Sequence, residues 1–87
     1  ETQLYISDAL VRNFNILLPA DQISFPLEGI SVKTRSRSQY SDARIERISD
    51  DCLKIIFHQP QKAVAPGQSA VFYQEDRVLG GGIFALQ

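Results

Sequence analysis

Alternation of hydrophobic and polar positions predicts several short β-strands in this chain. It is clearest between Cys52 and His58. The apolar positions of that segment are Leu53, Ile55 and Phe57. Because successive side chains of a strand point to opposite faces, these three side chains share one face. The segment is therefore predicted to be a strand with one face toward a core.

Similar alternation predicts strands elsewhere in the chain. They are expected over residues 3–7, 10–18, 30–37, 43–48, 69–73 and from 78 toward the end. Within the fourth of these, Ile48 breaks the alternation that Ala43 and Ile45 begin. A break of this kind indicates a β-bulge or a local twist, which we expect near Arg47.

Turn-forming residues separate the predicted strands. Breaks or connections are expected at 8–9, at Pro19, over 20–29 and 38–42, and at 49–51, 59–61 and 74–77. Pro66-Gly67 suits a type II turn, because proline fixes φ at one central position and glycine accepts a positive φ at the next. Each predicted strand is thus short and bounded.

These elements predict the fold class. About six short strands without a helix are typical of an antiparallel β-barrel or sandwich. Closure into a barrel also removes exposed sheet edges, so we predict a small all-β barrel. The glycines at 80–82 lie within the last predicted strand and precede no helix, so they indicate a strand bend beside another backbone rather than a phosphate-binding loop.

Composition limits what the domain can be. The 87 residues are expected to form one domain (1–87), and a first residue other than Met suggests a piece of something longer. No apolar run is long enough to cross a membrane, so no membrane partner is expected. The single cysteine, Cys52, permits no internal disulfide and fits a reducing, cytoplasmic setting.

One predicted strand carries a row of basic side chains. Lys33, Arg35 and Arg37 lie at alternate positions and share one face, about 6.6 Å apart along the strand. This is close to the spacing of successive phosphates on a nucleic-acid strand. Ser36 lies on the opposite face, and Tyr40 beyond the strand could stack on a base or pack. The row is either a phosphate-binding face or a solvated face, and the net charge of −1 favours the second.

Candidate catalytic and metal-binding residues are few. Cys52 and His58 lie six positions apart in one predicted strand, on the order of 20 Å, which is too far for a nucleophile and its base. The acidic pairs at 50–51 and 75–76 fall at predicted turns and lack the spacing of a calcium loop. We expect no catalytic, cofactor-binding or metal-binding residue in this chain.

Three segments carry a family resemblance. Residues 64–73 read Val-Ala-Pro-Gly-Gln-Ser-Ala-Val-Phe-Tyr, residues 77–83 read Arg-Val-Leu-Gly-Gly-Gly-Ile, and residues 32–37 read Val-Lys-Thr-Arg-Ser-Arg. Together with residues 57–60, they resemble the C-terminal domain of tRNA-specific 2-thiouridylases. These are ATP-dependent enzymes that place sulfur on the wobble uridine of certain tRNAs. The resemblance covers about residues 4–83, strongly from Val32 onward and loosely before it.

The resemblance implies a role and partners. The domain would be the C-terminal β-barrel of a larger enzyme, whose remaining domains bind ATP, carry the catalytic cysteines and receive sulfur from a donor protein. This chain would itself be non-catalytic and would help to grip tRNA. Arg35 and Ser36 match tRNA-contacting positions of the family, and Gln68 matches another. Lys33 and Arg37 are added on electrostatic grounds.

An alternative remains beside this expectation. Barrels of similar shape in translation factors serve as packing or protein-interaction modules without contacting RNA. The near-neutral charge of this chain favours that alternative, because a nucleic-acid-binding domain usually carries a basic surface.

Overall fold

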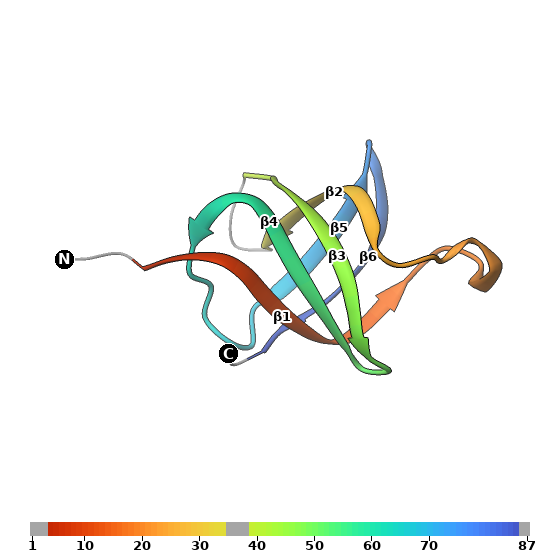
Figure 1. Ribbon diagram of the computed structural model, residues 1–87, viewed down its shortest axis with the longest axis horizontal. Helices are drawn as coiled ribbons and strands as arrows, with labels where there is room; N and C mark the ends of the chain where they lie inside the picture. Colours follow the sequence, from red (N-terminus) through yellow and green to blue (C-terminus); the bar gives the residue numbers. More distant parts are fainter. Residues whose placement is uncertain (1–3, 35–38, 86–87) are drawn as a thin grey trace.

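Six strands form a closed antiparallel β-barrel in the computed structural model (Figure 1), which describes residues 4–34 and 39–85. The strands are β1 (Tyr5–Ile16), β2 (Leu27–Thr34), β3 (Ser41–Ser49), β4 (Cys52–Lys62), β5 (Ser69–Gln74) and β6 (Arg77–Phe84). Around the barrel their order is β1-β4-β3-β2-β5-β6, and β6 pairs with β1 to close it. The predicted all-β barrel is confirmed. One short 3-10 helix, η1 (Ala20–Gln22), lies in the connection between β1 and β2.

Two strands continue through positions where the sequence predicted a break. β1 continues through Asp8 and Ala9, where a break was expected, because the chain changes register between Ile6 and Asp8 instead of leaving the sheet. β4 continues to Lys62 through Pro60, which was expected to end it. Proline cannot donate to a ladder. Pro60 is tolerated because it lies between Ile56 and Gln61, where the pairing of β4 with β1 is interrupted.

The predicted turn at Pro66-Gly67 and the predicted irregularity near Arg47 are present, whereas the loop expected over 38–42 ends earlier, because β3 begins at Ser41. The register of β3 against β4 shifts between Arg47 and Ser49, which confirms the irregularity inferred from Ile48. Gly67 adopts φ +91°, as a type II turn after Pro66 requires. The amide of Gln68 donates to the carbonyl of Ala65 across this turn at 3.4 Å.

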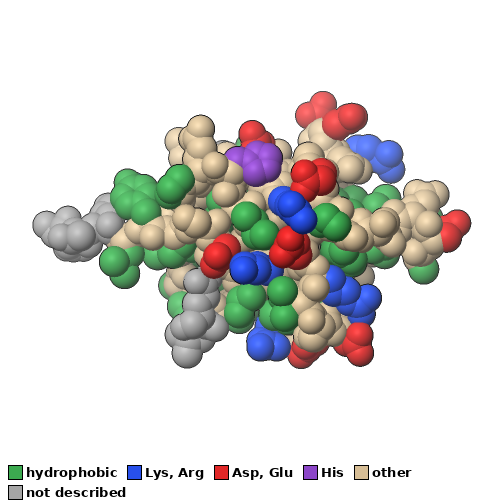
Figure 2. Space-filling view, viewed as in Figure 1, with side chains coloured by type: hydrophobic (Ala, Val, Ile, Leu, Met, Phe, Trp, Pro, Cys, Tyr) green, Lys and Arg blue, Asp and Glu red, His purple; other side chains and the backbone are tan. Residues whose placement is uncertain are grey.

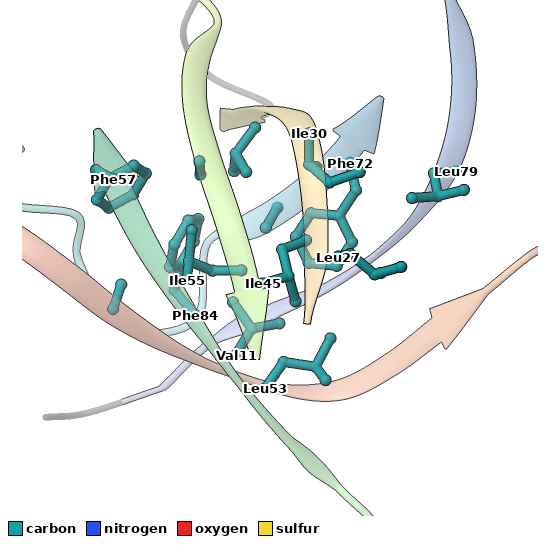
Figure 3. Packing of buried hydrophobic residues seen from close by; sticks show 14 residues of the cluster. Val11, Leu27, Ile30, Ile45, Leu53, Ile55, Phe57, Phe72, Leu79 and Phe84 are labelled. Carbon is teal, nitrogen blue, oxygen red and sulfur yellow. The ribbon is translucent and has the colours of Figure 1, made fainter. Parts of the chain in front are cut away.

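The barrel interior is filled by apolar side chains from all six strands (Figure 3). The large side chains that are wholly buried are Phe72, Ile30, Ile45, Leu53, Ile55 and Val11. Leu27 also points inward in Figure 3 and is buried. The expectation that residues 20–29 form only a connection is therefore wrong for its last three residues. Strand β2 begins at Leu27, which pairs with Ile45 of β3.

The glycines of β6 allow the barrel to close. A Cβ atom at Gly80 would overlap the carbonyl oxygen of Asn15 in β1, and one at Gly81 would overlap the carbonyl oxygen of Ala70 in β5. At Gly82 it would overlap the side chain of Val11. The prediction that these glycines mark a close backbone approach is confirmed. Below, the pairing of β1 with β6 is called the closing seam.

Candidate RNA-binding surface

Lys33 lies on the outer surface of β2. Its neighbours Val32 and Thr34 are buried, so strand alternation directs the Lys33 side chain away from the core. The Lys33 Nζ atom lies 5.2 Å from the centroid of the Tyr40 ring, within the range of a cation–π contact. No ion pair joins Lys33 to a carboxylate within the described part of the chain. The positive charge of Lys33 is therefore not neutralised by a partner in residues 4–34 or 39–85.

Three predicted site residues lie outside the described residues. They are Arg35, Ser36 and Arg37, which follow the last residue of β2. Their proposed contacts with RNA accordingly stay predictions. Their only link to the described site is that they follow Thr34 directly in the sequence.

Gln68 lies between the Pro66-Gly67 turn and β5, and it is half-buried. Its backbone is fixed, because its carbonyl oxygen accepts a 2.8 Å hydrogen bond from the amide of Phe84. In the register between β2 and β5, Thr34 pairs with Ala70, two residues after Gln68. Lys33 and Gln68 therefore approach the same end of one strand pair, although they are far apart in the sequence.

Two tyrosine rings adjoin Lys33. Tyr40 and Tyr73 meet edge to face, with ring centroids 5.0 Å apart and planes at 78°. The contact is possible because β2 lies between β3 and β5, which brings the residue preceding β3 close to Tyr73. Beside the rings is a hollow of about 350 Å³. Its lining residues are Ser31, Tyr40, Tyr73, Glu75 and Asp76.

Two described basic side chains of β3, Arg44 and Arg47, are paired with acidic side chains. Arg44 contacts Glu28 at 3.3 Å and Glu46 at 3.0 Å, and Arg47 contacts Asp50 at 2.7 Å. Figure 2 shows acidic and basic side chains interleaved over the face formed by β3 and β4. Exposed pairs of this kind contribute about 0–1 kcal/mol each to stability. Because the charges of these pairs cancel, the face formed by β3 and β4 has little positive electrostatic potential to attract RNA.

The whole barrel matches a known type of domain. A family model described as the aminomethyltransferase beta-barrel domain covers residues 8–84, which include almost all of the six strands. This chain belongs to that family. The match agrees with the closed barrel and with the resemblance that the sequence carries.

Relatives within this family are tRNA-specific 2-thiouridylases named MnmA. The chain is 54% identical to the protein of Methylococcus capsulatus over 56 residues, which are 64% of the chain and 15% of that protein. It is 36% identical to the protein of Orientia tsutsugamushi over 87 residues, which are 100% of the chain and 23% of that protein. For Actinobacillus pleuropneumoniae the identity is 53% over 57 residues, or 66% of the chain and 15% of that protein. The resemblance to the C-terminal domain of the 2-thiouridylases is thus confirmed, and the chain spans less than a quarter of the length of these relatives.

The one cysteine and the one histidine of this chain lie apart from each other. Cys52 is buried at the start of β4, whereas His58 is exposed farther along the same strand. Among residues 4–34 and 39–85, no three His, Cys, Asp or Glu side chains are grouped to hold a metal ion. No helix in these residues combines the length and hydrophobicity that a membrane crossing requires.

Sequence reasoning identified Tyr40 but missed Tyr73 and the hollow. The interpretation of Tyr40 left stacking and packing open. The ring does pack on Tyr73, yet 55% of Tyr40 stays exposed. Alternation within β5 could have placed Tyr73 on the face opposite the buried Phe72. The pairing of β2 with both β3 and β5 was needed to bring the two rings together.

Proposed function

We propose that this barrel is the C-terminal domain of a tRNA 2-thiouridylase and that it helps to hold the tRNA. The observation that carries the proposal is the family match over 8–84, joined by relatives whose name specifies thiolation of tRNA. The unneutralised Lys33 on the outer surface of β2 supports it. In this proposal the barrel positions the RNA and supplies no reacting group.

The rest of the reaction belongs to domains beyond this barrel. We propose that the longer enzyme uses ATP to activate uridine, receives sulfur from a donor protein and works in the cytoplasm. The lengths of the relatives support a longer enzyme, because this chain spans 15% to 23% of them. Most of the length of those relatives lies outside the alignment with this chain. We assign nucleotide binding and catalysis to the corresponding part of the longer enzyme.

The proposed contact surface combines two strands. Lys33, Arg35 and Arg37 would face phosphates, while Ser36 and Gln68 would donate or accept hydrogen bonds. Such contacts fix the position of the RNA but do not read its sequence. Three basic groups give a log–log salt slope of only about −2 to −3, so we expect weak, salt-sensitive binding by this chain.

Replacing Lys33 by glutamine tests the electrostatic part of the proposal. The variant Lys33→Gln should bind tRNA more weakly, and its salt slope should be smaller by about 1, because one fewer counterion is released. Fluorescence anisotropy of labelled tRNA over a series of salt concentrations measures both quantities. The matched control is Lys54→Gln on β4, where the lysine lies 3.9 Å from Asp8. If both variants and the wild type had the same salt slope, Lys33 would not contact the RNA.

A second test addresses the residues assigned by resemblance. The double variant Arg35→Ala, Gln68→Ala should bind tRNA at least about tenfold more weakly, because the hydrogen bond of a charged group such as Arg35 alone contributes about 1.5–3 kcal/mol. The same anisotropy assay measures it. Circular dichroism must first show an intact fold, since the backbone of Gln68 is bonded to Phe84. Wild-type affinity would show that these two positions do not contact the RNA.

A packing or protein-interaction module is the second candidate. It is favoured by the net charge of −1 and by exposed apolar side chains on β1 and just before it, where Leu4 is 73% and Tyr5 is 61% exposed. Nuclear magnetic resonance discriminates the two functions. Addition of tRNA should shift the resonances around Lys33 and Gln68 if the barrel binds RNA. A packing module would leave them unchanged.

A further inference from the structure

The hollow beside Tyr40 and Tyr73 has the composition of a binding site for a flat, polar ring. We call this hollow, lined among the described residues by Ser31, Tyr40, Tyr73, Glu75 and Asp76, the tyrosine hollow. Its volume of about 350 Å³ lies within the range of small-molecule sites, about 300–1,000 Å³. Tyr40 is 55% exposed although it packs on Tyr73. A large aromatic surface therefore remains open beside a concave space.

We propose that the tyrosine hollow binds one unstacked nucleobase of the RNA, which stacks on Tyr40 while the adjoining phosphate contacts Lys33. The inference rests on the proposed function and adds to it a contact with a base. Proteins that recognise single-stranded RNA commonly stack bases on aromatic side chains. Here Tyr73 supports the ring from its side and limits its rotation, which reduces the entropy lost on binding.

The position of Lys33 favours a nucleotide over a basic peptide. An aromatic ring with nearby carboxylates also suits a cationic side chain. However, the Lys33 Nζ atom already lies 5.2 Å from the centre of the Tyr40 ring. A second cation on that ring would meet a like charge. A nucleotide instead brings a neutral base for the ring and a negative phosphate for the lysine.

The acidic side chains of the hollow predict which bases fit. Glu75 and Asp76 form the turn between β5 and β6, and neither makes an ion pair within residues 4–34 and 39–85. Their carboxylate oxygens accept hydrogen bonds. Guanine presents two adjacent donors, N1–H and the exocyclic amine, on one edge. Uracil presents a single N–H between two carbonyl oxygens, which the carboxylates would repel. We therefore expect guanine to bind more tightly than uracil.

Binding of short single-stranded RNAs to the 87-residue chain tests the inference. One RNA consists of uridines, and the other has one guanosine among uridines. The guanosine-containing RNA should bind more tightly, and Tyr40→Ala should weaken its binding about fivefold or more, since stacking contributes about 1–3 kcal/mol per base. Tyr40→Phe keeps the ring and should bind like the wild type. Ile48→Ala is the matched control, because Ile48 is also 55% exposed but lies near the far end of β3.

Salt dependence separates the outcomes. If the inference holds, Tyr40→Ala lowers affinity without changing the salt slope, whereas Lys33→Gln changes the slope. Salt-sensitive binding that Tyr40→Ala leaves unchanged would overturn the stacking contact and leave the proposed function standing. Equal binding of the two RNAs would overturn the preference for guanine.

Two further results would contradict the nucleobase inference as a whole. Absence of binding to any RNA, tRNA included, would remove both the inference and the proposed function. The resonances of Tyr40 and Tyr73 could also shift on addition of an arginine-containing peptide and not of RNA. In that case the tyrosine hollow would be a site for a protein partner, and the nucleobase inference would be wrong.

Discussion

Replacing Phe72 by alanine should remove about 3–5 kcal/mol from the free energy of unfolding. Phe72 is wholly buried at the middle of β5, and its ring lies among the side chains that fill the barrel (Figure 3). Its backbone pairs with Val32 of β2 on one side and with Gly80 of β6 on the other. Alanine would therefore leave a cavity that a closed barrel cannot collapse to fill. Domains of this size have only about 5–15 kcal/mol of stability in total, so the loss would be a large fraction of it.

Urea unfolding followed by circular dichroism measures the effect of Phe72→Ala. The urea concentration at the midpoint should fall by a large fraction, whereas the slope should change little if the native and unfolded states keep their exposed areas. Phe72→Leu, which keeps most of the volume, should lose less than about 1.5 kcal/mol. Val78→Ala provides a surface control, because Val78 is 52% exposed. A loss below about 1 kcal/mol for Phe72→Ala would contradict the packing described for the core.

Replacing Gly80 by alanine should open the closing seam. The new Cβ atom would overlap the carbonyl oxygen of Asn15 and crowd the Cα of Ile16, which pairs with Gly80. These contacts are with backbone atoms, so no side-chain rotation can relieve them. Overpacking typically costs about 1–3 kcal/mol and sometimes more, and we expect Gly80→Ala to lie at or above the upper end of that range.

Amide hydrogen exchange locates the damage caused by Gly80→Ala. Amides of β1 and β6 at the seam should lose protection before those of β3 and β4, because their ladder is the one displaced. Gly29→Ala is the matched control. A Cβ atom there meets nothing within 4 Å, and only the φ of +68° is unfavourable, at about 1–2 kcal/mol. If Gly80→Ala were no more harmful than Gly29→Ala, close approach would not be the reason for this glycine.

Much of the barrel follows from local patterns in the sequence. The core face of β4 was predicted because Leu53, Ile55 and Phe57 alternate with polar or outward-facing residues. The bulge near Arg47 was predicted because Ile48 disturbs the same kind of alternation. In each case a few neighbouring residues carry the whole pattern, so no knowledge of the other strands was required.

The errors occur where distant strands decide the structure. Asp8 and Pro60 are both poor strand residues when read locally, yet each lies beside a register shift that the partner strand accommodates. Leu27 belongs to β2 because it pairs with Ile45, a contact that no local pattern reveals. The tyrosine hollow escaped prediction for the same reason, since its two rings come from segments on either side of β2.

The closing seam also constrains how this chain reaches its native state. It joins Val11 to Phe84, so the first and last strands must meet before the core is sealed. Bringing such distant segments together has an entropic cost that no local contact offsets. Folding of this barrel should therefore resemble that of other non-local β-proteins, on a scale of about milliseconds to seconds rather than microseconds. Until β6 arrives, the open edges of β1 and β5 are exposed to pairing with other chains.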